Sequence, residues 1–188
     1  AAVALRRADK MRAAVDMDIW EKALGTKLND KGEQVVRTAS EIQNLKRTIE
    51  YATEYLKSGN SISYEMVNKM HEIILDSVRG SQKTPGKIRT TQNWIGPRGC
   101  TIDGATFIPP IPEEVYGLLI NLYEYMNDEF IDPLLVNIAL SHIQFETIHA
   151  YKDGNGRLGR ALIPVQMSLL DNSTPILYMS EILELYKP

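Results

Sequence analysis

The part of the sequence richest in chemically active side chains is a run of twelve residues at 149–160, HAYKDGNGRLGR. Gly154 and Gly156 lie just before a segment with helical periodicity, where free backbone N–H groups and the positive end of the helix dipole form an anion site. Arg157 and Arg160 are three residues apart and therefore project from one side of the first helical turn, above that site. Two guanidinium groups and two glycine amides form a suitable cradle for a polyphosphate.

Two further side chains in the same run add a metal ligand and a base. Asp153 supplies a hard oxygen ligand beside the cradle. Mg²⁺ needs such a ligand when it takes one carboxylate and draws its other ligands from phosphate and water. His149, four residues upstream, titrates near neutral pH and could act as a general base. The run therefore predicts the working parts of a nucleotide-dependent transferase.

Other interpretations of this run stay open from the residues alone. Asp-Gly-Asn-Gly is favourable turn chemistry, so the run could be a plain turn between two helices. The G-x-G-x-x-G pattern at 154–159 matches a dinucleotide fingerprint, but that fingerprint needs a preceding β-strand, and the preceding residues have helical period. His142, Glu146 and His149 share one helical face and would allow a zinc site, although their spacing matches no established signature. A P-loop is excluded, because its motif is absent from the sequence.

The elements that must position this run are mostly helices. Apolar residues recur at intervals of three and four in five segments, at about 34–56, 63–77, 113–127, 133–148 and 158–170. Pro164 is expected to kink the last of them. We therefore predict a mainly α protein in two parts, an N-terminal helical extension at 1–33 and one compact catalytic domain at 34–188.

One short stretch in the irregular region at 79–112 has the character of β structure. Residues 101–108 form two strand-like runs folded at Asp103-Gly104, a dipeptide that tolerates the positive φ angles of a two-residue hairpin turn. Pro109 and Pro110 end the second run, because proline cannot donate to a β-ladder. We predict a small β-hairpin here as the only β structure, with a solvated loop as the alternative.

Length and composition limit the classes of protein to consider. A chain of 188 residues fits one domain with a substantial core, and it has no apolar run long enough for a membrane span. The net charge of −3 gives no general attraction to nucleic acid or anionic lipid, so a bound anion must be held by a local cluster. The single cysteine, Cys100, cannot form an internal disulfide, and a reducing, cytoplasmic location is expected. The chain begins at Ala1 without an initiator methionine, as a fragment of a longer protein would.

The run at 149–160 resembles the signature of the Fic family, H-[PX]-[FY]-x-[DE]-G-N-G-R-x-x-R. Four other stretches are similar to characteristic segments of the family, in the same order: PGKIRTTQNWIGP at 85–97, ATFIPPIPEEV at 105–115, LSHIQFETIHAY at 140–151 and LYMSEIL at 177–183. The resemblance covers about residues 35–188. It implies a helical bundle of the Fic fold, with the hairpin as a small flap. It also implies transfer of AMP from Mg-ATP to a hydroxyl side chain of a target protein.

Carried onto this sequence, the resemblance gives roles to a base, a metal ligand and the flap. It makes His149 the general base that deprotonates the incoming hydroxyl as it attacks the α-phosphate. Asp153 would hold Mg²⁺ on the α- and β-phosphates. The predicted hairpin falls where the family has its target-docking flap, at Thr106, Phe107 and Ile108. An exposed strand edge there would pair with the main chain of the target.

The resemblance also assigns phosphate contacts and partners. Asn155 and the amides around Gly154 to Gly156 would contact phosphate, and Arg157 and Arg160 would anchor the β and γ groups. The expected partners are ATP with Mg²⁺ and a protein with a Ser, Thr or Tyr hydroxyl, including the chain itself. We expect no membrane partner. We also expect no nucleic acid bound by this chain, although many bacterial members carry a further DNA-binding domain. A homo-oligomer stays open.

Two residues depart from the family pattern, Ala150 in place of the usual proline and Tyr151 in place of the usual phenylalanine, and neither removes a chemical role. Many members carry an inhibitory [ST]-x-x-x-E-[GN] motif. The runs at 61–65 and 180–184 match it only without the final Gly or Asn, so the sequence identifies no inhibitory glutamate. The same fold also leaves open transfer of another phosphate-containing group, removal of AMP from a modified protein, or a non-catalytic nucleotide-binding module.

Overall fold

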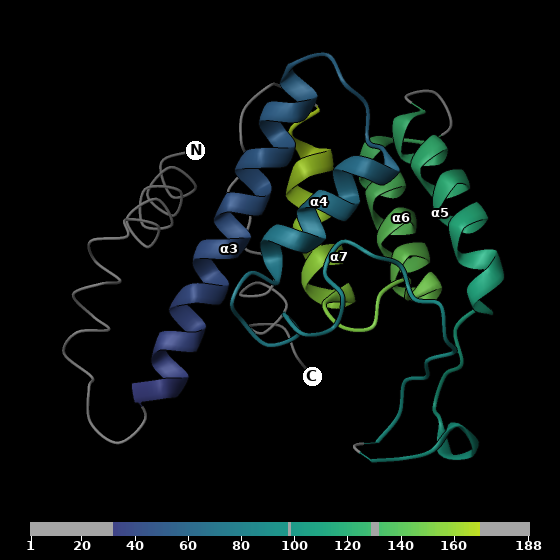
Figure 1. Cartoon of the computed structure of the whole chain (residues 1–188). Helices are drawn as coiled ribbons and strands as arrows, with labels where there is room; N and C mark the ends of the chain where they lie inside the picture. The colour runs from purple at the N-terminus through teal and green to yellow at the C-terminus, as the bar shows by residue number, and fades with distance from the viewer. Residues whose placement is uncertain (1–31, 98, 129–131, 170–188) are drawn as a thin grey trace, which may run out of the picture. The chain divides into compact units, whose positions relative to one another are not determined.

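A computed structural model of the chain describes residues 32–97, 99–128 and 132–169. Within these ranges the chain forms five α-helices and one short 3₁₀-helix (Figure 1). The α-helices are α3 (Gly32–Lys57), α4 (Tyr64–Ile74), α5 (Pro112–Asn127), α6 (Leu134–Ile148) and α7 (Asn155–Met167). The prediction of a mainly α fold is confirmed.

By its contacts the chain divides into two units, Ala1–Ser40 and Glu41–Pro188, and the predicted site lies wholly in the second. The predicted N-terminal extension falls almost entirely outside the described residues. None of the helices in the described ranges combines the length and the apolar character that a membrane span requires.

Local sequence signals set where the helices begin. The hydroxyl of Ser63 caps α4 by accepting a hydrogen bond from Met66 N–H at 3.2 Å. Pro112 opens α5, because its fixed φ suits a first turn, and two glutamates follow it near the positive end of the helix dipole. Gly154, with a φ of 86°, precedes the first residue of α7. This helix therefore begins earlier than its apolar periodicity alone predicts, and Pro164 lies inside it.

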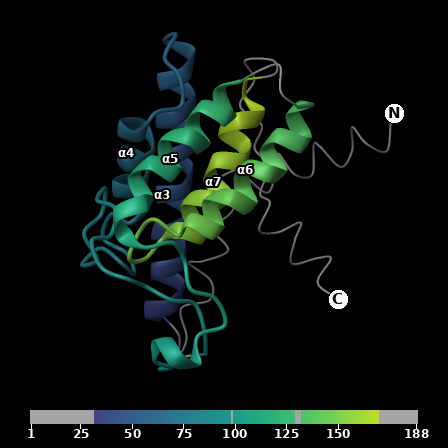
Figure 2. The ribbon, with the colours of Figure 1, turned by 90° about the vertical axis from the view of Figure 1, so that its right-hand side faces the viewer.

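The core lies among α4, α5, α6 and α7. Helix α6 packs against α5 and α7, and α4 contacts the same two helices (Figure 2). The interior is filled by buried side chains from all four, among them Met66, Met70, Leu119, Leu122, Phe145, Ile148, Leu158 and Leu162. Burial of each such side chain contributes about 2 kcal/mol. Because α6 and α7 both pack into this core, the positions of both ends of the turn that joins them are fixed.

The region 101–108 does not form the β-hairpin that the sequence predicts. A two-residue hairpin turn of the expected kind needs positive φ angles at Asp103 and Gly104, and neither residue has one. Instead Ile102–Gly104 forms a 3₁₀-helix. In it, Gly104 N–H donates to Thr101 O, and the N–H of the next residue donates to Ile102 O, each at 3.1 Å.

An isolated antiparallel β-bridge ties Phe107 to Ile95 instead. Ile95 N–H donates to Phe107 O at 2.9 Å, and Ile95 O accepts from the N–H groups of Thr106 and Phe107. The bridge closes a wider loop that needs glycine at its start, because a Cβ on Gly96 would lie 2.7 Å from Cys100 Sγ. Figures 1 and 2 show this segment reaching away from the ends of the helices.

Candidate active site

The turn between α6 and α7 holds His149 in an unusual backbone conformation. His149 has φ 48° and ψ 56°, in the left-handed region, which costs a non-glycine residue about 1–2 kcal/mol. Its carbonyl oxygen accepts hydrogen bonds from Arg89 Nε at 3.0 Å and from Asn93 Nδ2 at 3.2 Å. These contacts from a distant segment stabilise the strained turn.

Arg89 is the side chain that joins this turn to the segment before α5, and it is only 1% exposed. Besides His149 O, its guanidinium donates to the carbonyl oxygens of Thr91, Pro110 and Ile148. Its backbone N–H donates to Ala150 O at 2.9 Å. Burial lowers the pKa of Arg89 from its usual value, yet arginine stays charged in proteins. We assigned no role to Arg89 from the sequence, because a lone arginine in an irregular segment is expected to be exposed to solvent.

The imidazole of His149 is arranged to act as a base. Its Nδ1 lies 3.3 Å from the backbone oxygen of Glu146. A carbonyl oxygen can only accept, so this contact requires the hydrogen on Nδ1 and leaves a lone pair on Nε2. Burial lowers the pKa of His149, and the positive charge of Arg89 adds to this effect, while the contact with Glu146 opposes it. The ring is therefore neutral at physiological pH, as a general base must be.

We expect the rate of a reaction in which His149 accepts a proton to rise with pH through a pKa below that of an ordinary histidine. Only neutral His149 can accept a proton, and its lowered pKa keeps it neutral into the acidic range. Kcat/KM measured from about pH 5 to pH 8 checks this. Glu146→Gln removes a nearby negative charge that favours the imidazolium, so its acidic limb should move to still lower pH. A limb that moves to higher pH in this variant would contradict the assignment.

Asp153 and Gly154 form the entry to α7. The N–H of Gly154 donates to Asp153 Oδ1 at 2.6 Å. Arg157 Nη2 lies 3.2 Å from the same oxygen, and Arg79 Nη2 lies 3.9 Å from it. Gly154 is required for its positive φ and for space, because a Cβ there would lie 3.1 Å from His71 Nε2. The carboxylate therefore lies at the positive end of the α7 dipole.

The donor set around Asp153 fits Mg²⁺ bound to a nucleotide better than a metal held by protein alone. No group of three or more His, Cys, Asp or Glu that could hold a metal ion occurs in the described ranges, so the zinc alternative gains no support. Mg²⁺ commonly takes one carboxylate and fills its octahedron with phosphate oxygens and water. One oxygen of Asp153 is held by Gly154 and Arg157, which leaves Oδ2 for a cation.

The two arginines of the run differ in their surroundings. The Arg157 side chain is 14% exposed and bound to Asp153, to Glu41 Oε1 at 3.4 Å and to the carbonyl oxygen of Arg79 at 2.7 Å. Arg160 is half-buried, and no hydrogen bond or ion pair occupies its guanidinium among the described residues. Its Nη1 would lie 3.2 Å from a Cβ on Gly156, in the first turn of α7. Arg160 is therefore the arginine available to an anion.

Two buried side chains lock the turn from inside. Asn155 is 2% exposed; its Oδ1 accepts from Tyr151 N–H at 2.9 Å and its Nδ2 donates to Tyr151 O at 2.7 Å. His71 of α4, fully buried, lies with Nε2 2.9 Å from Asp153 O and accepts from Gly86 N–H at 2.8 Å. Its ring stacks on Tyr151 at 3.9 Å. The phosphate contact predicted for Asn155 stays a prediction. The sequence missed His71, because this residue meets Asp153 across 82 positions and leaves no local pattern.

The predicted flap residues Thr106, Phe107 and Ile108 are all exposed. Phe107 and Ile108 are joined by other exposed apolar side chains of the same segment, among them Trp94 and Ile95. Phe107 already pairs with Ile95 through both of its backbone groups. The segment thus presents an apolar surface beside a short bridge.

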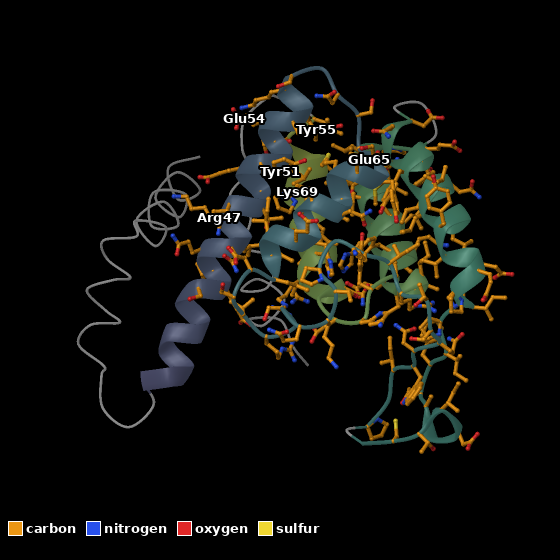
Figure 3. The ribbon with its side chains drawn as sticks, in the orientation of Figure 1. Arg47, Tyr51, Glu54, Tyr55, Glu65 and Lys69 are labelled. Atoms are coloured by element: carbon orange, nitrogen blue, oxygen red, sulfur yellow. The ribbon has the colours of Figure 1, made fainter. Side chains whose placement is uncertain are left out.

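Another polar group, on α3 and α4, belongs to a different face. Figure 3 shows Arg47 and Tyr51 on α3 beside Lys69 on α4. Their charges are satisfied locally, because Arg47 pairs with Asp76 at 3.1 Å and Lys69 with Glu72 at 2.8 Å. These exposed ion pairs carry little stability.

The chain is a mainly helical protein with a histidine, a carboxylate and arginines gathered at the start of one helix. Sequence comparison identifies the family. The family model described as "Fic/DOC family" matches residues 61–167, and the chain belongs to that family. It is 32% identical over 114 residues to proteins named protein adenylyltransferase fic-1 from Caenorhabditis briggsae and Caenorhabditis elegans. Each match covers 59% of this chain and 20% of the relative. The chain therefore spans about a fifth of those proteins.

A third relative and two solved structures agree with this assignment. The probable protein adenylyltransferase aq_aa38 of Aquifex aeolicus is 37% identical over 62 residues, which cover 33% of this chain and 19% of that protein. A Fic domain containing signaling protein from Bacteroides thetaiotaomicron superposes with a TM-score of 0.64 at 18% identity, over 80% of this chain and 55% of that chain. Fic-1 from C. elegans gives 0.60 at 23% identity, over 79% and 41%. The predicted Fic fold is confirmed.

Proposed function

We propose that this chain is the catalytic domain of a protein adenylyltransferase, which transfers AMP from Mg-ATP to a Ser, Thr or Tyr hydroxyl of a target protein. One observation carries the proposal. A neutral histidine whose Nε2 carries a lone pair lies on the same short turn as a carboxylate at the N-terminus of a helix, and an arginine with no partner among the described residues follows in that helix. The relatives named as protein adenylyltransferases support the same activity.

In the proposed reaction His149 moves one proton. The hydroxyl oxygen of the target attacks the α-phosphorus, and Nε2 of His149 takes the hydroxyl proton. The bond from the α-phosphorus to the oxygen bridging to the β-phosphorus breaks, and pyrophosphate leaves with that electron pair. Mg²⁺ held by Asp153 would offset the negative charge that develops on pyrophosphate.

The first turn of α7 would hold the phosphates. Its backbone N–H groups at Asn155 and Gly156 lie at the positive end of the dipole. Arg160 adds a guanidinium with no other partner among the described residues. The Asn155 amide contributes by keeping the turn closed on Tyr151. Catalysis would then rest on positioning and electrostatics with a single proton transfer.

The flap would dock the target. Backbone groups of Ile108 and the exposed side chains of Phe107 and Trp94 are available beside the Ile95 bridge. Main-chain pairing aligns an acceptor whatever its sequence, and the apolar side chains favour a partner with an apolar residue near the modified hydroxyl. Loss of docking without loss of ATP binding is expected when these side chains are truncated.

The position of the label in ATP tests the proposed function. The full chain is incubated with Mg²⁺ and ATP labelled in either the α- or the γ-phosphate, alone and with a cell lysate, and modified peptides are mapped by mass spectrometry. Label from the α-phosphate alone, with an AMP adduct on Ser, Thr or Tyr, is expected. Label from the γ-phosphate would indicate phosphoryl transfer, and release of AMP from an adenylylated protein would indicate the reverse activity. ATP binding with no adduct would indicate a non-catalytic module.

A further inference from the structure

A row of charged groups runs from α3 to the turn before α7. Arg157 lies between two carboxylates, with Nη1 3.4 Å from Glu41 Oε1 and Nη2 3.2 Å from Asp153 Oδ1. Nη2 also donates to the carbonyl oxygen of Arg79 at 2.7 Å. The Nε of Arg157 is buried and has no partner among the described residues. This guanidinium is therefore enclosed by protein and cannot meet a phosphate without releasing a carboxylate.

Enclosure sets Arg157 apart from Arg160. Moving Arg157 to a nucleotide would break its contacts with Glu41 at 3.4 Å and with Asp153 at 3.2 Å. Arg160 would break none among the described residues. Binding of a phosphate therefore costs less free energy at Arg160 than at Arg157, and Arg157 stays with the carboxylates.

The charge around Asp153 explains why Glu41 matters. A carboxylate paired with a single arginine has no net charge and attracts a divalent cation weakly. With Glu41 on the other side of Arg157, the three groups together keep one net negative charge. Arg79 lies 3.9 Å from Asp153, but its side chain is 76% exposed, so solvent screens its charge.

The same contacts also fix the direction of the carboxylate. Oδ1 of Asp153 is held by Gly154 N–H at 2.6 Å and by Arg157. Oδ2 has no hydrogen-bond partner among the described residues, and its direction follows from the contacts of Oδ1. Groups that orient a ligating side chain and adjust its charge govern metal affinity although they never touch the metal.

We propose that Glu41 and Arg157 are positioning residues, which set the charge and the direction of Asp153 for a divalent cation. This inference rests on the proposed function, because it takes Asp153 as the cation ligand. It assigns Glu41, which no sequence motif indicated, to the site.

Two binding measurements on the full chain test the proposal. Mn²⁺ binding is followed by electron paramagnetic resonance without and with ATP, and ATP binding is followed by calorimetry in EDTA. The variants are Glu41→Gln, Arg157→Gln, Arg157→Lys and Arg160→Gln. Glu50→Gln is the matched control, because Glu50 lies on the same helix in an exposed pair with Lys46. Thermal unfolding checks that each variant is folded, and Glu41→Gln, which keeps the size of a half-exposed side chain, is the mildest change.

We expect the variants of the two arginines to differ in these measurements. Glu41→Gln removes one negative charge and should raise the dissociation constant for Mn²⁺ about tenfold, with the affinity for metal-free ATP unchanged. Arg157→Gln removes a positive charge together with the group that orients Asp153, so its decisive readout is metal-free ATP, whose affinity should be unchanged. Arg157→Lys keeps the positive charge but loses the planar fork that orients Asp153, so it should raise the dissociation constant for Mn²⁺ and leave metal-free ATP unchanged. Arg160→Gln should weaken metal-free ATP by about tenfold and leave Mn²⁺ binding without nucleotide unchanged. Glu50→Gln should match wild type in both.

Three results would overturn it. Metal-free ATP weakened as much by Arg157→Gln as by Arg160→Gln would make Arg157 a phosphate ligand. Wild-type Mn²⁺ affinity in Glu41→Gln would remove Glu41 from the site. Tighter metal-free ATP in Glu41→Gln would mean that Glu41 competes with phosphate for Arg157. A wild-type chain that binds no ATP would contradict the proposed function, while the Mn²⁺ titrations without nucleotide would still decide the roles of Glu41 and Arg157.

Discussion

Replacement of His149 by alanine is expected to slow transfer of the α-labelled group by at least about a hundredfold while ATP still binds. In the proposed reaction the ring accepts the hydroxyl proton at Nε2, and among the described residues it makes one long hydrogen bond, at 3.3 Å. Loss of a general base lowers a rate by about a hundredfold to ten-thousandfold. The measurement is the initial rate of label incorporation at saturating ATP, beside calorimetry of ATP binding.

The control for this variant is His142→Ala, since His142 lies in α6, which ends just before His149, and we give it no catalytic part. It should transfer AMP as wild type does. His149→Asn tests geometry further, because it keeps a polar group at the turn but has no basic nitrogen, and it should be as inactive as alanine. Transfer at the wild-type rate in either His149 variant would rule out the histidine as the base.

Many residues of the candidate site could be picked out from the sequence alone, because they lie close together along the chain. The G-N-G stretch is turn chemistry with a glycine that takes a φ of 86°, and the helix that follows repeats apolar residues at three and four. His149, Asp153 and the arginines lie on one short segment, so their proximity follows from chain connectivity alone. Periodicity likewise predicted the helices, because each buries one face against the others.

What the sequence could not reveal depends on contacts between distant residues. Glu41 meets Arg157 across 116 positions, and Arg89 meets His149 across 60. Neither pair leaves a periodic trace. The hairpin prediction was wrong for a related reason. Asp103-Gly104 is a strong local turn signal, but the dipeptide lies in a 3₁₀-helix. Phe107 pairs instead with Ile95, which lies well before that turn in the sequence. Tertiary pairing overrode local preference.

The largest loss of stability is expected from Arg89, which holds the histidine turn in place. Arg89→Ala removes the donor shared by the carbonyl oxygens of Thr91, Pro110, Ile148 and His149. Buried acceptors left without a partner cost about 1–3 kcal/mol each, so the free energy of unfolding should fall by about 3 kcal/mol or more. Where the variant stays folded, the freed turn should misplace His149 and lower kcat by about a hundredfold.

Urea unfolding measures the loss of stability, and the label assay measures the fall in kcat. Arg89→Lys tests whether either effect is due only to the loss of positive charge. Lysine keeps the cation, but its compact ammonium cannot reproduce the planar fork that reaches several carbonyl oxygens, so both stability and kcat should still fall. Arg47→Ala is the control: it removes an exposed arginine paired with Asp76 and should cost less than about 1 kcal/mol. If Arg89→Ala unfolds at the same urea concentration as Arg47→Ala, Arg89 does not hold the turn. The left-handed conformation of His149 would then have to be maintained by Asn93 and the two flanking helices alone.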